Sequence, residues 1–413
     1  MMMRCQSTRS LFLLIFTLAP LAGCRGADSE LLARDPAVAK PPPEEHPRQR
    51  LPLGDSCRWL WNQQAEDGGW HSQHYGLLKS GQAYTPFILH TLLEVPESIC
   101  PRPAGAVERA LQFIRRNTNA AGVIGMSDPD VLEYPNYSTA YALLCFLKID
   151  PTDPLVGRMA DYLRRQQYRE TRGFPDDHPA HGGWGFGGTL SDGQPGHMDL
   201  AHTRRVLQAL NAADRLHRDA GQAAERFLRL VQRHPTCQRA QPQLDPDHSR
   251  SETVALYDGG FYFSPVVLAA NKGRVERETE QPYLRSYASA TCDGVLSLLQ
   301  AGVTAEDERV QKAIEWLMLH PQIDYPAGVP TDHPEPWGEA SHFYHLAVRA
   351  EANRALQIKG DWQQRIRDHL VELQRDDGHF VNQSSPLMKE DDPLLATTLA
   401  VIALVQSSQR GDQ

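Results

Sequence analysis

Apolar residues recur along most of the chain at the three- and four-residue intervals of an α-helix. Ala110 and Ile114 fall on one face of a helix expected over residues 106–116, and Leu207 and Leu210 share a face further on. A helix with one apolar stripe buries that stripe and exposes the opposite face. The pattern therefore predicts amphipathic helices joined by turns.

These helices come in pairs, and the pair repeats six times. The first helix of each pair typically carries an aromatic-aliphatic pair and often ends in Gln, and a Gly-rich turn with an aromatic residue usually follows. First helices are expected around Trp59, over 106–116, and around Tyr162, Phe227, Trp316 and His369. The second helices are rich in small residues and are expected over 84–93, 137–147, 200–213, 290–301, 342–356 and 394–405.

The ends of the repeat array indicate how the pairs are arranged. An open solenoid needs polar terminal repeats, but the terminal repeats here resemble the middle ones. The segment from Leu394 to Val405 is apolar nearly all round, so protein must surround it. We therefore expect an all-α fold in which six helical hairpins close into an (α/α)6 toroid. An open right-handed solenoid is the alternative.

The first residues indicate export. Arg4 and Arg9 precede a short apolar run over residues 11–18, as in a signal peptide. Leu21-Ala22-Gly23-Cys24 then resembles the lipobox of bacterial lipoproteins. That resemblance implies cleavage before Cys24 and a lipid on its sulfur, which would anchor the protein to a membrane of the cell envelope, facing the periplasm or the exterior. An ordinary secretory signal with a chance cysteine is the alternative.

The domain organisation follows from composition. Residues 1–23 are the expected lipoprotein signal peptide, and residues 24–54 are a tether rich in proline and charge. The toroid is expected over 55–408, with a tail over 409–413.

Cysteine and charge content add two expectations. Of seven cysteines, Cys57 begins the first expected helix and Cys100 follows its antiparallel partner, so both lie at one end of a hairpin. A Cys57–Cys100 disulfide is predicted, because an exported protein meets an oxidising compartment. The net charge is −9 and no long basic run occurs, so no nucleic-acid partner is expected.

Two spacings carry a family resemblance. Leu60-xxx-Gln64-xxx-Gly68-x-Trp70 fits the QW motif of squalene and oxidosqualene cyclases, and Leu370-xxx-Gln374-xxx-Gly378-x-Phe380 repeats it with Phe for Trp. With the GGWGF stretch at 182–186, the chain resembles the terpenoid cyclase and protein prenyltransferase β-subunit superfamily from about Asp55 to Ser408. The resemblance implies outer helices around an inner barrel. We interpret Gln64, Trp70, Gln374 and Phe380 as scaffold.

The same resemblance implies candidate metal ligands. The segment that begins Asp293-Gly294-Val295 is similar to the prenyltransferase stretch whose Asp and Cys bind zinc, and Phe343-Tyr344-His345 is similar to its F-Y-H. Asp293 and His345 are thus candidate zinc ligands, although Val295 replaces the cysteine. Cys292, three residues before Val295, is the third candidate. The alternatives are an N-cap for Asp293 and buried core positions for His345 and Cys292.

Candidate ligand-binding residues lie near the expected starts of the second helices. Ala180-His181-Gly182-Gly183-Trp184 is similar to a prenyltransferase stretch whose His contacts the isoprenoid diphosphate, so His181, Trp184 and Tyr344 are candidates. Asp199 and His202, three residues apart, either extend this polar site or cap and pair with each other.

Three functions remain open. The D-x-D-D acid of squalene cyclases is absent, because the Asp pairs at 176–177, 376–377 and 391–392 fall in expected turns. The first function is an anchored toroid that binds a hydrophobic ligand or a protein without family catalysis. The second is a zinc-dependent enzyme that processes an isoprenoid or similar lipid with Asp293 and His345. The third is a glycan-active toroid with carboxylates from Asp258, Asp293 and Glu339 near Trp337.

Overall fold

The computed structural model describes residues 52–128, 131–188, 193–235, 257–277 and 280–408. Within the strands, residues 274–277 and 280–283 are described by their backbone alone. The predicted signal peptide, Cys24 and nearly all of the predicted tether lie outside these residues. In the described part, no helix is both long and apolar enough to span a membrane.

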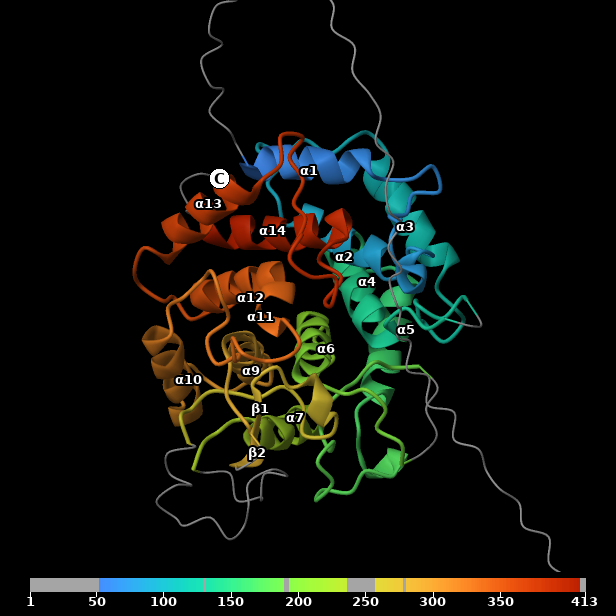
Figure 1. Cartoon of the computed structure of the whole chain (residues 1–413). Coiled ribbons are helices and arrows are strands. Elements are labelled where there is room, and N and C mark those ends of the chain that lie inside the picture. The colour runs from blue at the N-terminus through green and yellow to red at the C-terminus, as the bar shows by residue number, and fades with distance from the viewer. Residues whose placement is uncertain (1–51, 129–130, 189–192, 236–256, 278–279, 409–413) are drawn as a thin grey trace, which may run out of the picture. The chain divides into compact units, whose positions relative to one another are not determined.

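Twelve of the described helices form six hairpins, with one inner and one outer helix in each (Figure 1). The outer helices are α1 (Pro52–Asn62), α3 (Ala106–Arg116), α5 (Pro154–Arg165), α7 (Arg218–Val231), α10 (Glu308–Leu319) and α13 (Trp362–Leu373). The inner helices are α2 (Tyr84–Leu93), α4 (Pro135–Ile149), α6 (Leu200–Ala212), α9 (Ala288–Gln300), α12 (His342–Ala355) and α14 (Pro393–Ser407).

The inner helices pack in chain order, and α14 returns to contact α2 and α1. The array is therefore a closed ring, which confirms the predicted (α/α)6 toroid. Residues Leu399, Val401 and Ala403 of α14 are all buried, as a helix that is apolar on nearly every side requires.

Several short elements that the apolar periodicity did not predict lie in the turns between helices. They are the one-turn helix α11 (Trp337–Ala340), the 3-10 turns η1 (Gly76–Leu78), η2 (Glu170–Arg172) and η3 (Leu268–Ala270), and the antiparallel strands β1 (Arg274–Arg277) and β2 (Glu280–Leu284). They are too short to leave a periodic apolar pattern, and they sit in connections that lead into inner helices.

A repeated glutamine contact joins consecutive outer helices. The Gln167 side-chain amide, at the end of α5, donates to Gly182 O and to Ala220 O in the first turn of α7, at 2.9 Å each. Gln232 makes the same pair of bonds to Gly259 O and Arg309 O at 2.9 and 2.8 Å.

The glycine in this turn cannot be replaced by a residue with a side chain without strain. Gly182 has a φ of +89°, and a Cβ there would lie 1.8 Å from Ala223 O on the neighbouring outer helix. Close approach of the turn backbone to the next helix thus explains the Gly-rich sequence.

Polar contacts also lock the last hairpin onto the first. Gln374 Nε2, after α13, donates to Pro52 O at 2.9 Å and to Ser56 Oγ at 2.8 Å. Asp392, the N-cap of α14, accepts from Ser72 Oγ at 2.5 Å and from Tyr84 OH at 3.0 Å. Residues about 320 positions apart in sequence thereby close the ring.

The two cysteines predicted to form a disulfide lie against each other. Both are buried, one on α1 and one after α2. The Cys57 thiol hydrogen-bonds the Cys100 sulfur, which raises the pKa of Cys57 and lowers the pKa of Cys100 to about 7. This adjacency suits oxidation, and the disulfide stays a prediction.

We predict that Gln167→Leu destabilises the toroid, because it leaves the buried carbonyls of Gly182 and Ala220 without their donor. The expected loss in the free energy of unfolding is about 2–4 kcal/mol. Urea unfolding followed by circular dichroism measures it. Gln112→Leu, at an exposed position of α3, is the matched control, and equal stability of the two variants would contradict a linking role for Gln167.

Candidate functional site

A cavity of about 400 Å³ opens at the end of the barrel where the inner helices begin. We call it the apolar cavity. The starts of α2, α4, α6, α12 and α14 contribute to its wall, as do α11 and the connections before α9 and α14. Most of the lining is aromatic or aliphatic and includes Leu78, Tyr84, Phe87, Tyr134, Tyr137, Phe263, Trp337, Tyr344, Leu395 and Leu399.

Two histidines hold one carboxylate at the wall of this cavity. Asp199 is the N-cap of α6 and accepts from the His202 backbone N–H and from His202 Nδ1, both at 2.9 Å. His197 Nε2 lies 2.9 Å from the same carboxylate. Burial by itself would raise the pKa of Asp199, but the charges and hydrogen bonds of His202 and His197 outweigh it and hold this pKa well below its usual range.

This arrangement orients His202. Because Nδ1 donates to Asp199, Nε2 is the ring nitrogen left for another partner. That nitrogen is buried and has no hydrogen-bond partner among the described residues. His202 as a whole is only 7% exposed. A buried polar atom without a partner can bond a polar group brought by a ligand. Both sequence alternatives for Asp199 and His202 therefore hold, since the pair caps α6 and also lines the cavity.

Lys272 and Glu390, which the sequence patterns did not indicate, also line the cavity. Lys272 Nζ lies 4.8 Å from the Phe263 ring centre and 5.6 Å from that of Trp337, and burial lowers its pKa. Glu390 accepts from the backbone N–H groups of Phe343 and Tyr344 at 2.9 and 2.8 Å.

Burial raises the pKa of Glu390 to about 7, although the backbone N–H groups at the start of α12 act in the opposite direction. The Asn382 amide donates to the same carboxylate at 3.1 Å. A carboxyl group with this pKa in an apolar cavity can hold or release a proton near neutral pH.

Asp293 is held by a hydrogen bond from Tyr344 of the cavity wall and by an ion pair with Arg204. Its carboxylate accepts from Tyr344 OH at 2.7 Å and from Arg204 Nη1 at 2.9 Å, and Arg204 Nη2 also lies 2.7 Å from Glu351. Burial raises the pKa of Asp293 against the opposing effect of Arg204. Asp293 is not an N-cap, because that position of α9 belongs to Tyr287.

The three candidate zinc ligands do not converge. His345 Nε2 faces Gln322 O at 3.3 Å, and burial lowers the pKa of His345 to about 3. Burial raises the pKa of Cys292 to about 12. Asp293, His345 and Cys292 do not form a group of described residues whose ligand atoms lie within 4.8 Å of one another. Among the described residues, the only three-residue group close enough to share a metal ion is Glu170, Asp176 and His181, whose ligand atoms lie within 4.8 Å of one another.

His181 and Trp184 lie behind the cavity wall rather than in it. His181 Nδ1 is 3.0 Å from Phe174 O, and its Nε2 is 3.1 Å from Asp176. Trp184 is fully buried and its Nε1 donates to Leu163 O at 2.7 Å, as Trp70 does to Leu60 O. These partners of the two rings lie in α5 or in the turn itself, and neither residue lines the apolar cavity.

The carboxylates considered for glycan chemistry do not share a cleft. Asp258 accepts from Ser286 Oγ at 2.7 Å and from Trp316 Nε1 at 3.2 Å. Asp293 is held by Arg204, and Glu339 belongs to α11 but does not line the apolar cavity. Of this set only Trp337 lines the apolar cavity.

Solved structures share this architecture. No model of a known protein family matches the chain, and no curated protein matches it. The type II terpene cyclase MstE from Scytonema, in complex with its substrate geranylgeranyl dihydroxybenzoate, is 12% identical over 86% of this chain and 96% of its own, with a TM-score of 0.52. A structure of MstE with its product merosterolic acid A is 13% identical over 86% and 95%, again at 0.52.

A protein from Actinoplanes is 15% identical over 87% of this chain and 99% of its own, with a TM-score of 0.50. At these identities the likeness concerns the fold. The chain thus has a terpenoid cyclase-like α/α toroid fold, as the sequence resemblance implied.

We predict that Glu390 makes stability depend on pH. Its pKa lies at about 7 in the folded protein and near 4.5 as an ordinary glutamate, so the folded state binds this proton more tightly. The stabilisation is fully present below pH 4.5 and is lost as pH rises through 7. Relative to Glu390→Gln, the wild type should lose about 3 kcal/mol between pH 4.5 and 8.

Urea unfolding of both proteins across that pH range measures the difference. Glu108→Gln, at an exposed position of α3, reports what the same substitution does on the surface. A difference between wild type and Glu390→Gln that stays constant with pH would contradict the prediction.

Proposed function

We propose that the protein is an exported, lipid-anchored toroid that binds an amphipathic, isoprenoid-like molecule in its apolar cavity. The observation that carries the proposal is a cavity of about 400 Å³ at the end of the closed ring where the inner helices begin, with an aromatic wall and one oriented histidine. This volume lies within the range of small-molecule sites, which combine a mostly apolar lining with few polar groups.

The polar groups favour a ligand with one polar end. His202 Nε2 can bond a hydroxyl or carboxyl group, and the buried Lys272 ammonium is available on the same wall. The remaining rings, such as Tyr134, Tyr137 and Phe263, suit a hydrocarbon chain, because apolar surface leaves water on binding.

The structural neighbours support this class of ligand. MstE, whose fold the chain shares, is described with a geranylgeranyl-bearing substrate and with a merosterolic acid product. Binding without zinc chemistry is favoured, because Asp293 is held by Arg204 and Tyr344 while His345 faces a different segment.

A second candidate function is acid catalysis in the same cavity. Glu390 has its pKa raised to about 7, as a general acid needs for proton transfer near neutral pH. Glu390 lines the cavity, as Tyr344 does, and would be the proton donor to a leaving group of the bound ligand.

We predict that farnesol binds the wild-type domain and that Ala201→Phe prevents it. Ala201 lines the apolar cavity near the start of α6, so a phenyl ring there occupies the ligand space. Quenching of tryptophan fluorescence, to which Trp337 in the wall contributes, measures binding, and we expect at least a tenfold weakening. Ala121→Phe, at an exposed turn position, is the control.

The recovered ligand separates the two candidate functions. Unchanged farnesol after incubation supports binding alone, whereas an isomer that Glu390→Gln fails to produce supports acid catalysis. Equal quenching by farnesol in wild type and Ala201→Phe would contradict an isoprenoid site in this cavity.

We predict that Cys24 carries the membrane anchor. In bacterial cells the wild type should fractionate with membranes, and Cys24→Ser should not, since the lipid is attached to that sulfur. Cys5→Ser, within the predicted signal peptide, is the matched control. Equal membrane association of wild type and Cys24→Ser, detected by immunoblot, would contradict the anchor.

A further inference from the structure

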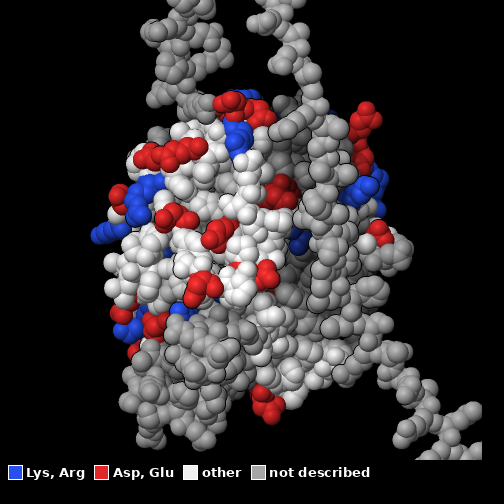
Figure 2. Space-filling model, in the orientation of Figure 1, with Lys and Arg blue, Asp and Glu red and all other residues white. Residues whose placement is uncertain are grey.

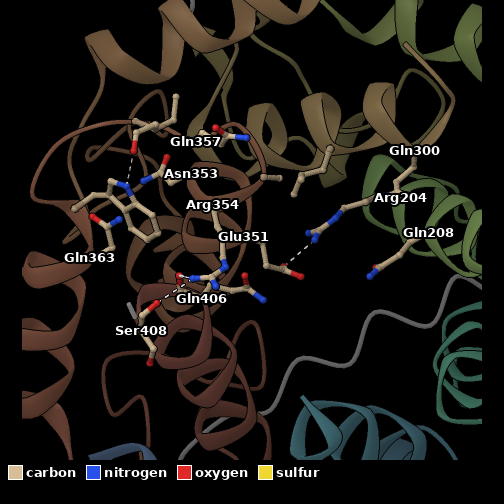
Figure 3. Close-up of a pocket in the computed structure, with 14 residues that line it drawn as sticks. Arg204, Gln208, Gln300, Glu351, Asn353, Arg354, Gln357, Gln363, Gln406 and Ser408 are labelled. Carbon is tan, nitrogen blue, oxygen red and sulfur yellow. Dashed lines mark hydrogen bonds and ion pairs between the residues drawn. The ribbon is translucent and has the colours of Figure 1, made fainter. Parts of the chain in front are cut away.

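A second and larger hollow, of about 830 Å³, lies where the inner helices end. We call it the polar hollow. The last turns of α6, α9, α12 and α14 and the first turn of α13 surround it (Figure 3). The hollow is separate from the apolar cavity, and the two have no lining residue in common. Arg204 lines the hollow and Tyr344 lines the cavity, and both donate to the Asp293 carboxylate.

Side-chain amides dominate this hollow. Gln208 and Gln300 lie on one side, and Gln357, Gln363 and Gln406 lie on the other with Asn353 (Figure 3). An amide both donates and accepts hydrogen bonds, and so does a hydroxyl group. A wall of amides therefore matches a ligand that presents many hydroxyl groups.

Part of this hydrogen-bonding capacity is already oriented. Gln300 Oε1 accepts from Asn211 Nδ2 at 2.9 Å, which leaves the Gln300 Nε2 to donate elsewhere. Gln208 Oε1 accepts from Arg205 in the same way, at 2.5 Å. Asn353 is 2% exposed, and its Oδ1 has no hydrogen-bond partner among the described residues.

Ion pairs and hydrogen bonds within the protein already engage the charged groups around the hollow. Arg204 pairs with Glu351 at 2.7 Å and with Asp293 at 2.9 Å. Arg354 Nη1 donates to the backbone carbonyls of Gln406 and Ser408 at 3.1 and 3.0 Å. Helix C-termini also disfavour anions. A neutral polar ligand therefore fits better than a phosphate or a carboxylate.

The apolar share of the lining is small. Leu296, Ile358 and Trp362 provide it, and the Trp362 Nε1 donates to Ile358 O at 2.9 Å. Three such residues can contact the C–H face of a sugar ring, while the amides around them bond its hydroxyl groups. From this lining we propose that the polar hollow is a second binding site, for a neutral saccharide.

Saturation-transfer NMR with maltotriose, cellotriose and triacetylchitotriose tests the site on the domain from residue 25 onward. We expect saturation transfer to at least one of these trisaccharides. The Gln300→Leu/Gln406→Leu double variant should bind it at least tenfold more weakly, because both amides line the hollow. Gln112→Leu/Gln311→Leu carries the same changes at exposed positions of α3 and α10 and should bind as the wild type does.

Three results would overturn the proposal: no transfer to any of the trisaccharides with folded wild type, equal binding by the two double variants, or tighter binding of the neutral peptide N-acetyl-trialanine amide than of every sugar. Farnesol binding is measured in parallel and should be unchanged in Gln300→Leu/Gln406→Leu. Failure of the saccharide site is thus distinguishable from failure of the apolar cavity.

Discussion

The glutamine that ends an outer helix and bonds the start of the next one is the contact on which the ring depends. Gln64, Gln167, Gln232 and Gln374 each donate to a carbonyl in their own turn and to a carbonyl at the start of the following outer helix. Unpaired buried carbonyls are costly, so these bonds fix the relative position of the hairpins at four of the six junctions of the ring. Because Gln374 reaches Pro52, the same contact that orders neighbours also joins the two ends of the array.

Closure gives the barrel two chemically different ends. The starts of the inner helices meet at an aromatic cavity, and their last turns meet at an amide-rich hollow. Buried charges around Arg204 lie between them, and such charges are tolerated only when paired, as Arg204 is with Asp293 and Glu351. On the face shown in Figure 2, both acidic and basic side chains are present, and the chain as a whole carries a net charge of −9.

Sequence reasoning located the helices well, because the apolar period is local. The inner helix expected over 84–93 has those bounds, and the one expected over 200–213 ends one residue earlier. The Asp199 and His202 pair was also found, since a three-residue spacing at a helix start is a local signal. Lys272 and Glu390 were missed, because they lie in connections that fold back over the cavity. Glu390 reaches Tyr344 across 46 residues of sequence, and no local pattern encodes that contact.

Position-by-position transfer from the resembling family makes Asp293 a candidate zinc ligand, but in the structure its carboxylate already has other partners. The residue occupies an inner helix, as the resemblance implied, but α6 presents Arg204 opposite it and α12 presents Tyr344. Its carboxylate oxygens therefore bond Arg204, which lines the polar hollow, and Tyr344, which lines the apolar cavity. Cys292 is buried on the same helix, α9, and Val295 offers no ligand atom. The distinct chemistry of this toroid lies instead at its two ends, in side chains that the closing of the ring brings together.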